Sequence, residues 1–132
     1  MKTESENSPF ADVIYTYTRS QAVADGLQID VTKTAQEAGI RFPVFLTRSV
    51  YDLYVTVPPG VTGQDVAGRL WDIVWMLRVA IQVARTGIKR IPVTLYVRDN
   101  HGLRLVRLTA TCGPLDLDDP QHAITVMLPE ED

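Results

Sequence analysis

The chain has 132 residues, 45% of them hydrophobic and 22% charged, and its formal net charge is −3 at pH 7. These values are typical of one globular domain with a real core, and they exclude wholesale disorder and a fibrous repeat. The single cysteine, Cys112, excludes an intramolecular disulfide and a cysteine-rich zinc site.

We expect residues 1–9 to form a flexible polar N-terminus, residues 10–129 to form a single domain and residues 130–132 to form an acidic tail. Residues 1–9 lack the apolar run of a secretory signal, and no later apolar stretch approaches the ~18 residues that a membrane span needs. The sequence therefore predicts a cytoplasmic protein without a membrane partner.

The first half of the chain predicts one strand and several short helices. β-Branched and aromatic residues favour a strand, while Gly26, Gly39 and the cap Thr47 mark helix ends and starts. The predicted elements are a strand over 12–18, a brief extended segment at 27–31, and helices over 21–25, 33–38 and 48–55.

Residues 64–85 predict one long helix with two apolar stripes. The first stripe is an ordinary core face. Its members are Val66, Leu70, Ile73, Val74, Leu77, Ala80, Ile81 and Ala84. The opposite side should be polar and carries Asp65, Arg69, Asp72 and Gln82, but it is interrupted by Trp71, Trp75, Met76, Val79 and Val83.

Trp71 and Trp75 are four residues apart, so their side chains should touch on the helix surface. An apolar patch of this size is rarely left exposed to solvent on a monomer. We expect both rings to be buried, either under the short helices between residues 33 and 55 or at a contact with another subunit or partner.

Three strands are predicted after the long helix, over 91–98, 103–112 and 123–128, the first two joined by a tight turn at 99–102. With the N-terminal strand they predict an α+β fold. It consists of a small, mainly antiparallel sheet of about four strands, with one long helix and two or three short helices packed on one face.

The charges are segregated along the chain. Residues 78–107 contain seven basic residues and one acidic residue, whereas residues 108–132 contain six acidic residues and no Lys or Arg. Two interpretations are open: these regions neutralise each other within the fold, or they face partners. The exposed candidates are Arg98, Arg104 and Arg107 in the hairpin, and Asp116, Asp118 and Asp119 near the acidic end. We do not expect direct nucleic-acid binding, because the pI is near 5.3.

No catalytic, metal or cofactor signature is present in the sequence. His101 and His122 lack a ligand spacing, and the acidic loop lacks the glycine and distal glutamate of a calcium-binding EF-hand. One similarity to an enzyme is present. Residues 14–18 and 22–27 look like the opening strand, helix and Gly-Leu step of ADP-ribosyltransferases. The strand there lacks the usual His or Arg, and no catalytic glutamate is marked, so an enzyme is kept only as an alternative.

A resemblance that covers much of the chain rests on Ala11–Arg19, Ala22, Asp25, Gly26, Asp30, Val31, Ala35, Glu37, Ala38, Gly39, Pro43, Val44, Thr47, Gly68–Asp72, Trp75, Met76, Cys112–Pro114 and Ile124–Pro129. At these positions the chain resembles a family of small bacterial proteins of unassigned activity, carried on plasmids, integrative elements and phage-related DNA. The resemblance implies no site residues. It implies a context in which small accessory proteins bind a host or competing machine, including CRISPR effectors.

The leading hypothesis is a non-enzymatic interaction protein of a mobile genetic element, in particular an anti-CRISPR-like inhibitor of a host protein or ribonucleoprotein complex. The candidate partner-binding residues are Trp71, Trp75, Arg98, Arg104, Arg107, Asp116, Asp118 and Asp119. The alternatives are an enzyme with a degenerate ADP-ribosyltransferase-like site and a homodimeric accessory protein joined through the tryptophans.

Overall fold

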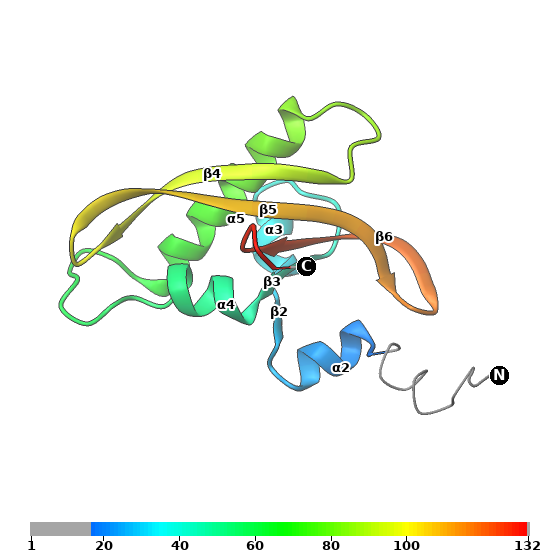
Figure 1. Ribbon diagram of the computed structural model, residues 1–132, viewed down its shortest axis with the longest axis horizontal. Helices are drawn as coiled ribbons and strands as arrows, with labels where there is room; N and C mark the ends of the chain where they lie inside the picture. The colour runs from blue at the N-terminus through cyan, green and yellow to red at the C-terminus, as the bar shows by residue number, and fades with distance from the viewer. Residues whose placement is uncertain (1–16, 132) are drawn as a thin grey trace.

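The computed structural model describes residues 17–131 (Figure 1). Its elements in chain order are α2 (Arg19–Ala24), β2 (Gln28–Asp30), α3 (Thr32–Glu37), β3 (Val44–Thr47), α4 (Arg48–Val50), the π-helix η1 (Tyr51–Val55), α5 (Val66–Val83), β4 (Arg90–Asp99), β5 (Gly102–Asp116) and β6 (Asp119–Met127).

Five strands form one sheet in the order β2-β3-β6-β5-β4, and all neighbours are antiparallel except β3 and β6. The predicted α+β class, with a mainly antiparallel sheet and one long helix, is confirmed. Most of the strand predicted over 12–18 lies outside the described residues, and its last two residues precede α2 without strand structure. The two short strands β2 and β3 extend the sheet beyond β6 instead.

Helix α5 lies across one face of the sheet, behind β4 and β5 in Figure 1. It begins after Asp65, whose carboxylate accepts a hydrogen bond from the backbone N–H of Gly68 at 2.6 Å and so caps the helix. Ile73 and Leu77 are fully buried in the core beside Val93 of β4. The core therefore sits between α5 and the sheet, with α3 and η1 packed against other parts of α5.

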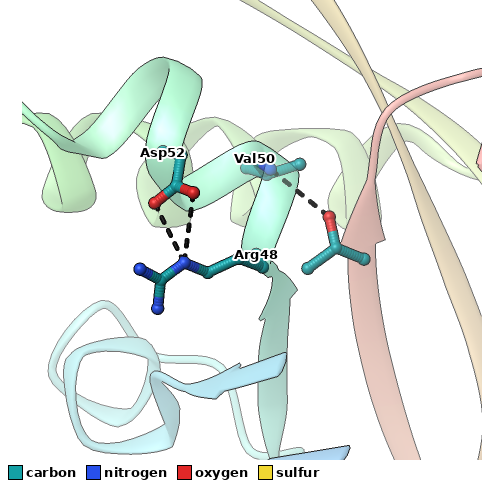
Figure 2. Close-up of polar contacts among 4 residues, drawn as sticks. Arg48, Val50 and Asp52 are labelled. Atoms are coloured by element: carbon teal, nitrogen blue, oxygen red, sulfur yellow. Dashed lines mark hydrogen bonds and ion pairs between the residues drawn. The ribbon is translucent and has the colours of Figure 1, made fainter. Parts of the chain in front are cut away.

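The helix predicted over 48–55 consists of one α-helical turn, α4, followed by the π-helix η1. Thr47 accepts a hydrogen bond from the N–H of Val50 through its hydroxyl, and Arg48 pairs with Asp52 through Nε at 3.1 Å (Figure 2). The wider π turn ends where the N–H of Thr56 donates to the carbonyl of Tyr51, five residues back.

Helix α2 is held on the sheet by Arg19. Its guanidinium donates to the Leu115 carbonyl at 2.6 Å and to the side chains of Gln28 and Thr125 at 2.9 Å, and it lies 4.3 Å from the centre of the Phe45 ring. Phe45 alternates with residues of β3 that point into the α5 core, so α2 and Arg19 cover part of the opposite sheet face. The same face of the β4–β5 hairpin stays exposed.

Candidate protein-docking site

The two tryptophans stand on the solvent side of α5 and are not covered by the short helices. Their rings are stacked, with centroids 6.0 Å apart and an interplanar angle of 22°. Trp71 is 37% exposed and Trp75 is 41% exposed. The expectation that the helices between residues 33 and 55 bury these rings is wrong, because α3 and η1 pack on other sides of α5. Within one molecule the pair is therefore available to a partner.

A groove of about 430 Å³ opens beside the tryptophan pair. We call it the tryptophan groove. Its lining residues are Trp71, Asp72, Trp75 and Met76 from α5, Thr94, Leu95 and Tyr96 from β4, and Leu105 from β5. Tyr96 and Leu105 are 63% and 52% exposed. The groove thus runs from the helix around the outer strand of the sheet to its uncovered face, and most of its walls are apolar or aromatic.

Strand β4 forms one edge of the sheet, and its register shows which backbone groups face outwards. The N–H of Cys112 donates to the carbonyl of Lys89 at 2.8 Å, which makes these two residues a hydrogen-bonded pair across the β4–β5 ladder. Hydrogen-bonded pairs alternate along antiparallel strands. The odd-numbered residues of β4 therefore bond to β5, while Pro92, Thr94, Tyr96 and others at even positions direct their backbone groups to the free edge. Pro92 fits this assignment, because it has no N–H to contribute to the ladder.

Arg69 lines a smaller hollow that adjoins one end of the tryptophan groove and shares Asp72, Leu95 and Tyr96 with it. Its side chain is buried at 4% exposure, donating from Nε to the Tyr54 carbonyl at 3.0 Å and from Nη1 to the Arg98 carbonyl at 2.7 Å. Its Nη2 has no hydrogen-bond partner among residues 17–131. The prediction that Arg69 lies on the polar side of the helix is wrong, because it joins η1, α5 and the edge of β4.

Two charged groups near this end of the groove have perturbed titration. Burial lowers the pKa of Arg69, an effect that the nearby carboxylates of Asp72 and Asp99 oppose. Burial also raises the pKa of Asp72, and the charge of Arg69 opposes that rise. A further cation lies at the other end, where the guanidinium of Arg78 is 4.9 Å from the centre of the Trp75 ring.

The three hairpin arginines do not act alike. Arg104 pairs with Asp99 at 2.5 Å within the hairpin itself. Arg98 and Arg107 are exposed and have no ion-pair partner among the described residues. Arg107 lies opposite Thr94 in the register, and Arg98 and Thr94 share the uncovered face of β4. These two arginines therefore border the tryptophan groove on the uncovered face.

The acidic candidates lie away from the tryptophan groove, and they differ from one another in what they contact. Asp116 accepts hydrogen bonds from the backbone N–H groups of Arg19 and Ser20 at 3.0 Å and of Leu117 at 2.8 Å. The Leu117 N–H contributes most to lowering the pKa of Asp116 below its usual range. Asp118 is exposed and Asp119 is half-buried in the β5–β6 turn. Asp116 is therefore part of the α2 attachment and is not free for a partner.

The basic hairpin tip and the acidic turn lie at opposite ends of β5, a strand of 15 residues. At about 3.3 Å per residue, roughly 45 Å of strand separates them. The turn therefore does not neutralise the tip arginines directly, whereas Arg90 of the basic region does reach the acidic end, through a hydrogen bond to the Glu131 carbonyl at 3.5 Å. The structure instead keeps the tryptophan groove and the acidic turn as separate surfaces.

Cys112 has a neighbour that the sequence did not indicate. Its Sγ lies 3.7 Å from Nδ1 of His122, because β5 and β6 pair in this region. Only the register between β5 and β6 brings Cys112 and His122 together, so neither residue type alone indicates this contact. Within residues 17–131, no three His, Cys, Asp or Glu side chains converge to hold a metal ion.

Comparisons with protein-family models, curated proteins and solved structures gave no match. In the part of the chain that the structure describes, no helix is long and apolar enough to cross a bilayer.

Proposed function

We propose that this protein is a non-enzymatic interaction protein whose tryptophan groove docks on another protein. The observation that carries the proposal is the stacked, solvent-exposed pair of Trp71 and Trp75 lining an apolar groove. Trp, Tyr and Arg are the residue types that dominate binding energy at protein interfaces. Tyr96 lines the same groove, and Arg98 lines an adjoining hollow that shares Tyr96 with it.

The resemblance to proteins of mobile elements supplies the context of the proposal. In that context the partner is a host protein or the protein part of a ribonucleoprotein in the cytoplasm, and binding inhibits a defence complex of the CRISPR type. A protein surface fits the groove better than a nucleic-acid backbone does. Asp72 lies in the groove, and the chain has a net charge of −3.

The test compares two variants that remove exposed aromatic rings. A photo-reactive amino acid placed at Val83, exposed on α5 outside the groove lining, captures the partner in the host, and the purified partner is then titrated by calorimetry. We expect the double variant Trp71→Ser, Trp75→Ser to weaken binding by about a hundredfold, as befits interface hot spots. Phe42→Ser removes a ring that is 41% exposed outside the groove and should leave affinity unchanged.

The inhibitory role is tested in cells that carry an active CRISPR system. Expression of the wild-type protein should restore plating of a targeted phage, and the double tryptophan variant should not. Equal restoration by that variant would contradict the groove as the contact. A wild-type protein that binds its partner but restores nothing would contradict inhibition.

A further inference from the structure

We infer that the occupant of the tryptophan groove is an extended segment of the partner that adds to the free edge of β4 as an antiparallel strand and alternates acidic and apolar residues. This inference rests on the proposed function, and it names the chemistry of the partner at the same site. Three properties of the edge support it: its open backbone groups, the chemistry of its two sides and the arginines beside it.

The open backbone groups occupy a short, bounded stretch of β4. Thr94 and Tyr96 each direct both an N–H and a C=O to the free edge, and no described residue bonds to them. The stretch is bounded by Pro92, which lacks an N–H, and by Arg98, whose carbonyl is taken by Arg69 at 2.7 Å. A strand that pairs antiparallel here exchanges both of its hydrogen bonds with each of the two open residues. Strand addition of this kind is an established mode of peptide recognition.

The two sides of the added strand would meet different chemistry. Successive side chains of a strand point to opposite faces of a sheet. On the α5 side, they enter the part of the groove formed by Trp71, Trp75 and Met76, which favours apolar residues. Asp72 on the same side disfavours an acidic residue there.

On the uncovered side, the added side chains lie next to those of Thr94 and Tyr96. The arginines of this face, Arg98 and Arg107, have no ion-pair partner among residues 17–131. Acidic side chains of the partner complement them, and because residues directly opposite share a face in an antiparallel pair, these acidic residues also carry the N–H groups that bond to β4.

A second copy of the chain is a poorer occupant of this edge. Self-pairing of β4 would bring together two strands that carry Arg90 and Arg98 and have no acidic residue before Asp99. Like charges across paired strands are destabilising. A partner segment with acidic residues is therefore favoured over β4 itself.

The first experiment uses a synthetic peptide of about nine residues that alternates aspartate and valine, the length of a short strand. Binding to the full chain is followed by fluorescence anisotropy of a labelled peptide. We expect saturable binding, and a peptide alternating lysine and valine should bind at least about tenfold more weakly. Equal binding of the two peptides would overturn the acidic assignment.

The decisive experiment methylates the backbone nitrogens of the peptide. Methylation of the aspartates removes the N–H groups that pair with β4, so binding should fall by at least about tenfold. Methylation of the valines leaves those groups intact, and this matched control should bind like the parent peptide. Any other pattern would overturn antiparallel addition.

A protein variant tests the same bonds from the other side. Thr94→Pro removes one edge-facing N–H, while the bonds to β5 are kept because residue 94 does not donate to the ladder. We expect this variant to melt as the wild type does and to lose peptide binding by at least about tenfold. Phe42→Ser, which lies outside the groove, keeps every backbone group of β4 and should bind normally. Unchanged binding by a folded Thr94→Pro variant would overturn the inference.

Amide hydrogen exchange supplies a readout that needs no variant. The amides of Thr94 and Tyr96 should exchange fast in the free protein and slow down with peptide, whereas Leu95 is protected in both states. Self-association of the free chain with slow exchange at these two amides would also overturn the inference. If the double tryptophan variant loses affinity for the partner but Thr94→Pro keeps it, the inference fails and the proposed function stands.

Discussion

At the residue scale, Trp75 and Leu77 of α5 differ in how far their side chains are buried. Leu77 is fully buried, whereas Trp75 keeps 41% of its surface exposed. Large apolar residues are worth most to folding when they are fully removed from water. Leu77 therefore contributes to stability, and the exposed part of Trp75 is available for the proposed docking.

This difference in burial predicts different losses in the free energy of unfolding when each side chain is replaced by alanine. Leu77→Ala should lower the free energy of unfolding by about 2–5 kcal/mol, as for other buried leucines. Trp75→Ala should cost less, about 1–3 kcal/mol, because its ring already faces water on one side. Urea denaturation of the two variants measures both values. A cost above about 3 kcal/mol for Trp75→Ala would show that the ring is covered in solution.

Arg69 is the one buried charged side chain among residues 17–131. Arg69→Lys keeps the charge but cannot reproduce a planar guanidinium that bonds two separate carbonyls. We expect a loss of about 2–4 kcal/mol, because buried polar groups are left unpaired. Arg107→Lys, at an exposed position, should change stability by less than about 0.5 kcal/mol in the same urea titration.

At the element scale, α2 depends on a carboxylate from the far end of the chain. Asp116 accepts the backbone N–H groups of Arg19 and Ser20, so the β5–β6 turn fastens the start of this helix. Arg19 in turn reaches back to the sheet through the Leu115 carbonyl. The attachment of α2 is therefore polar and is expected to respond to pH.

The pKa of Asp116 is lowered in the folded state, chiefly by the N–H of Leu117. Such a group contributes stability above its unfolded pKa, about 4, and the contribution is lost as the pH falls through the lower folded value. Asp116→Asn should therefore destabilise the protein at about pH 7 and have little further effect at about pH 2. Urea unfolding across this range tests the prediction, with Asp118→Asn as the exposed control. Equal pH profiles for wild type and Asp116→Asn would contradict it.

Several elements could be predicted from the sequence because their signals are local. The long helix predicted over 64–85 runs Val66–Val83, and the hairpin turns between Asp99 and Gly102 as its sequence predicts. The pairing of β3 with β6 could not be predicted, because it joins Val44 to Ile124 across most of the chain. Sequence patterns report periodicity within a segment, and they do not specify which distant segment pairs with it.

The candidate site was only half predictable. The i,i+4 spacing identified the tryptophan pair, but whether another element covers it depends on tertiary packing. Arg69 stands four residues before the buried Ile73, so its spacing already placed it near the core face, and its charge suggested the opposite. The open stretch at Thr94 and Tyr96 needed the register of β4 against β5. The sequence alone predicts strands, but it does not predict which strand lies at an edge of the sheet.

At the scale of the whole molecule, the surface separates opposite charges. The arginines beside the groove and the acidic β5–β6 turn lie at different ends of β5. Complementary charge near an interface acts mainly on the association rate, whereas distant charge is screened within about 10 Å at ordinary salt. Only the arginines are therefore expected to affect docking at the groove.

This separation predicts unequal effects of two charge reversals. Arg98→Glu with Arg107→Glu should slow association with the acidic peptide by about tenfold or more at low salt. Asp118→Lys with Asp119→Lys should leave that rate within about twofold, because the turn is far from the groove. Stopped-flow mixing at several salt concentrations measures both rates. A larger effect of the aspartate variant would move the contact to the acidic turn.

The parallel pair of β3 and β6 also determines when the molecule can finish folding. Val44 must wait for Ile124, whereas the β4–β5 hairpin pairs residues as close as Asp99 and Gly102. Closing a long loop costs entropy before any contact repays it, so local pairs form first and this distant one last. During synthesis β2 and β3 therefore leave the ribosome before β6, the strand that joins them to the rest of the sheet, and they stay exposed to aggregation until β6 is released.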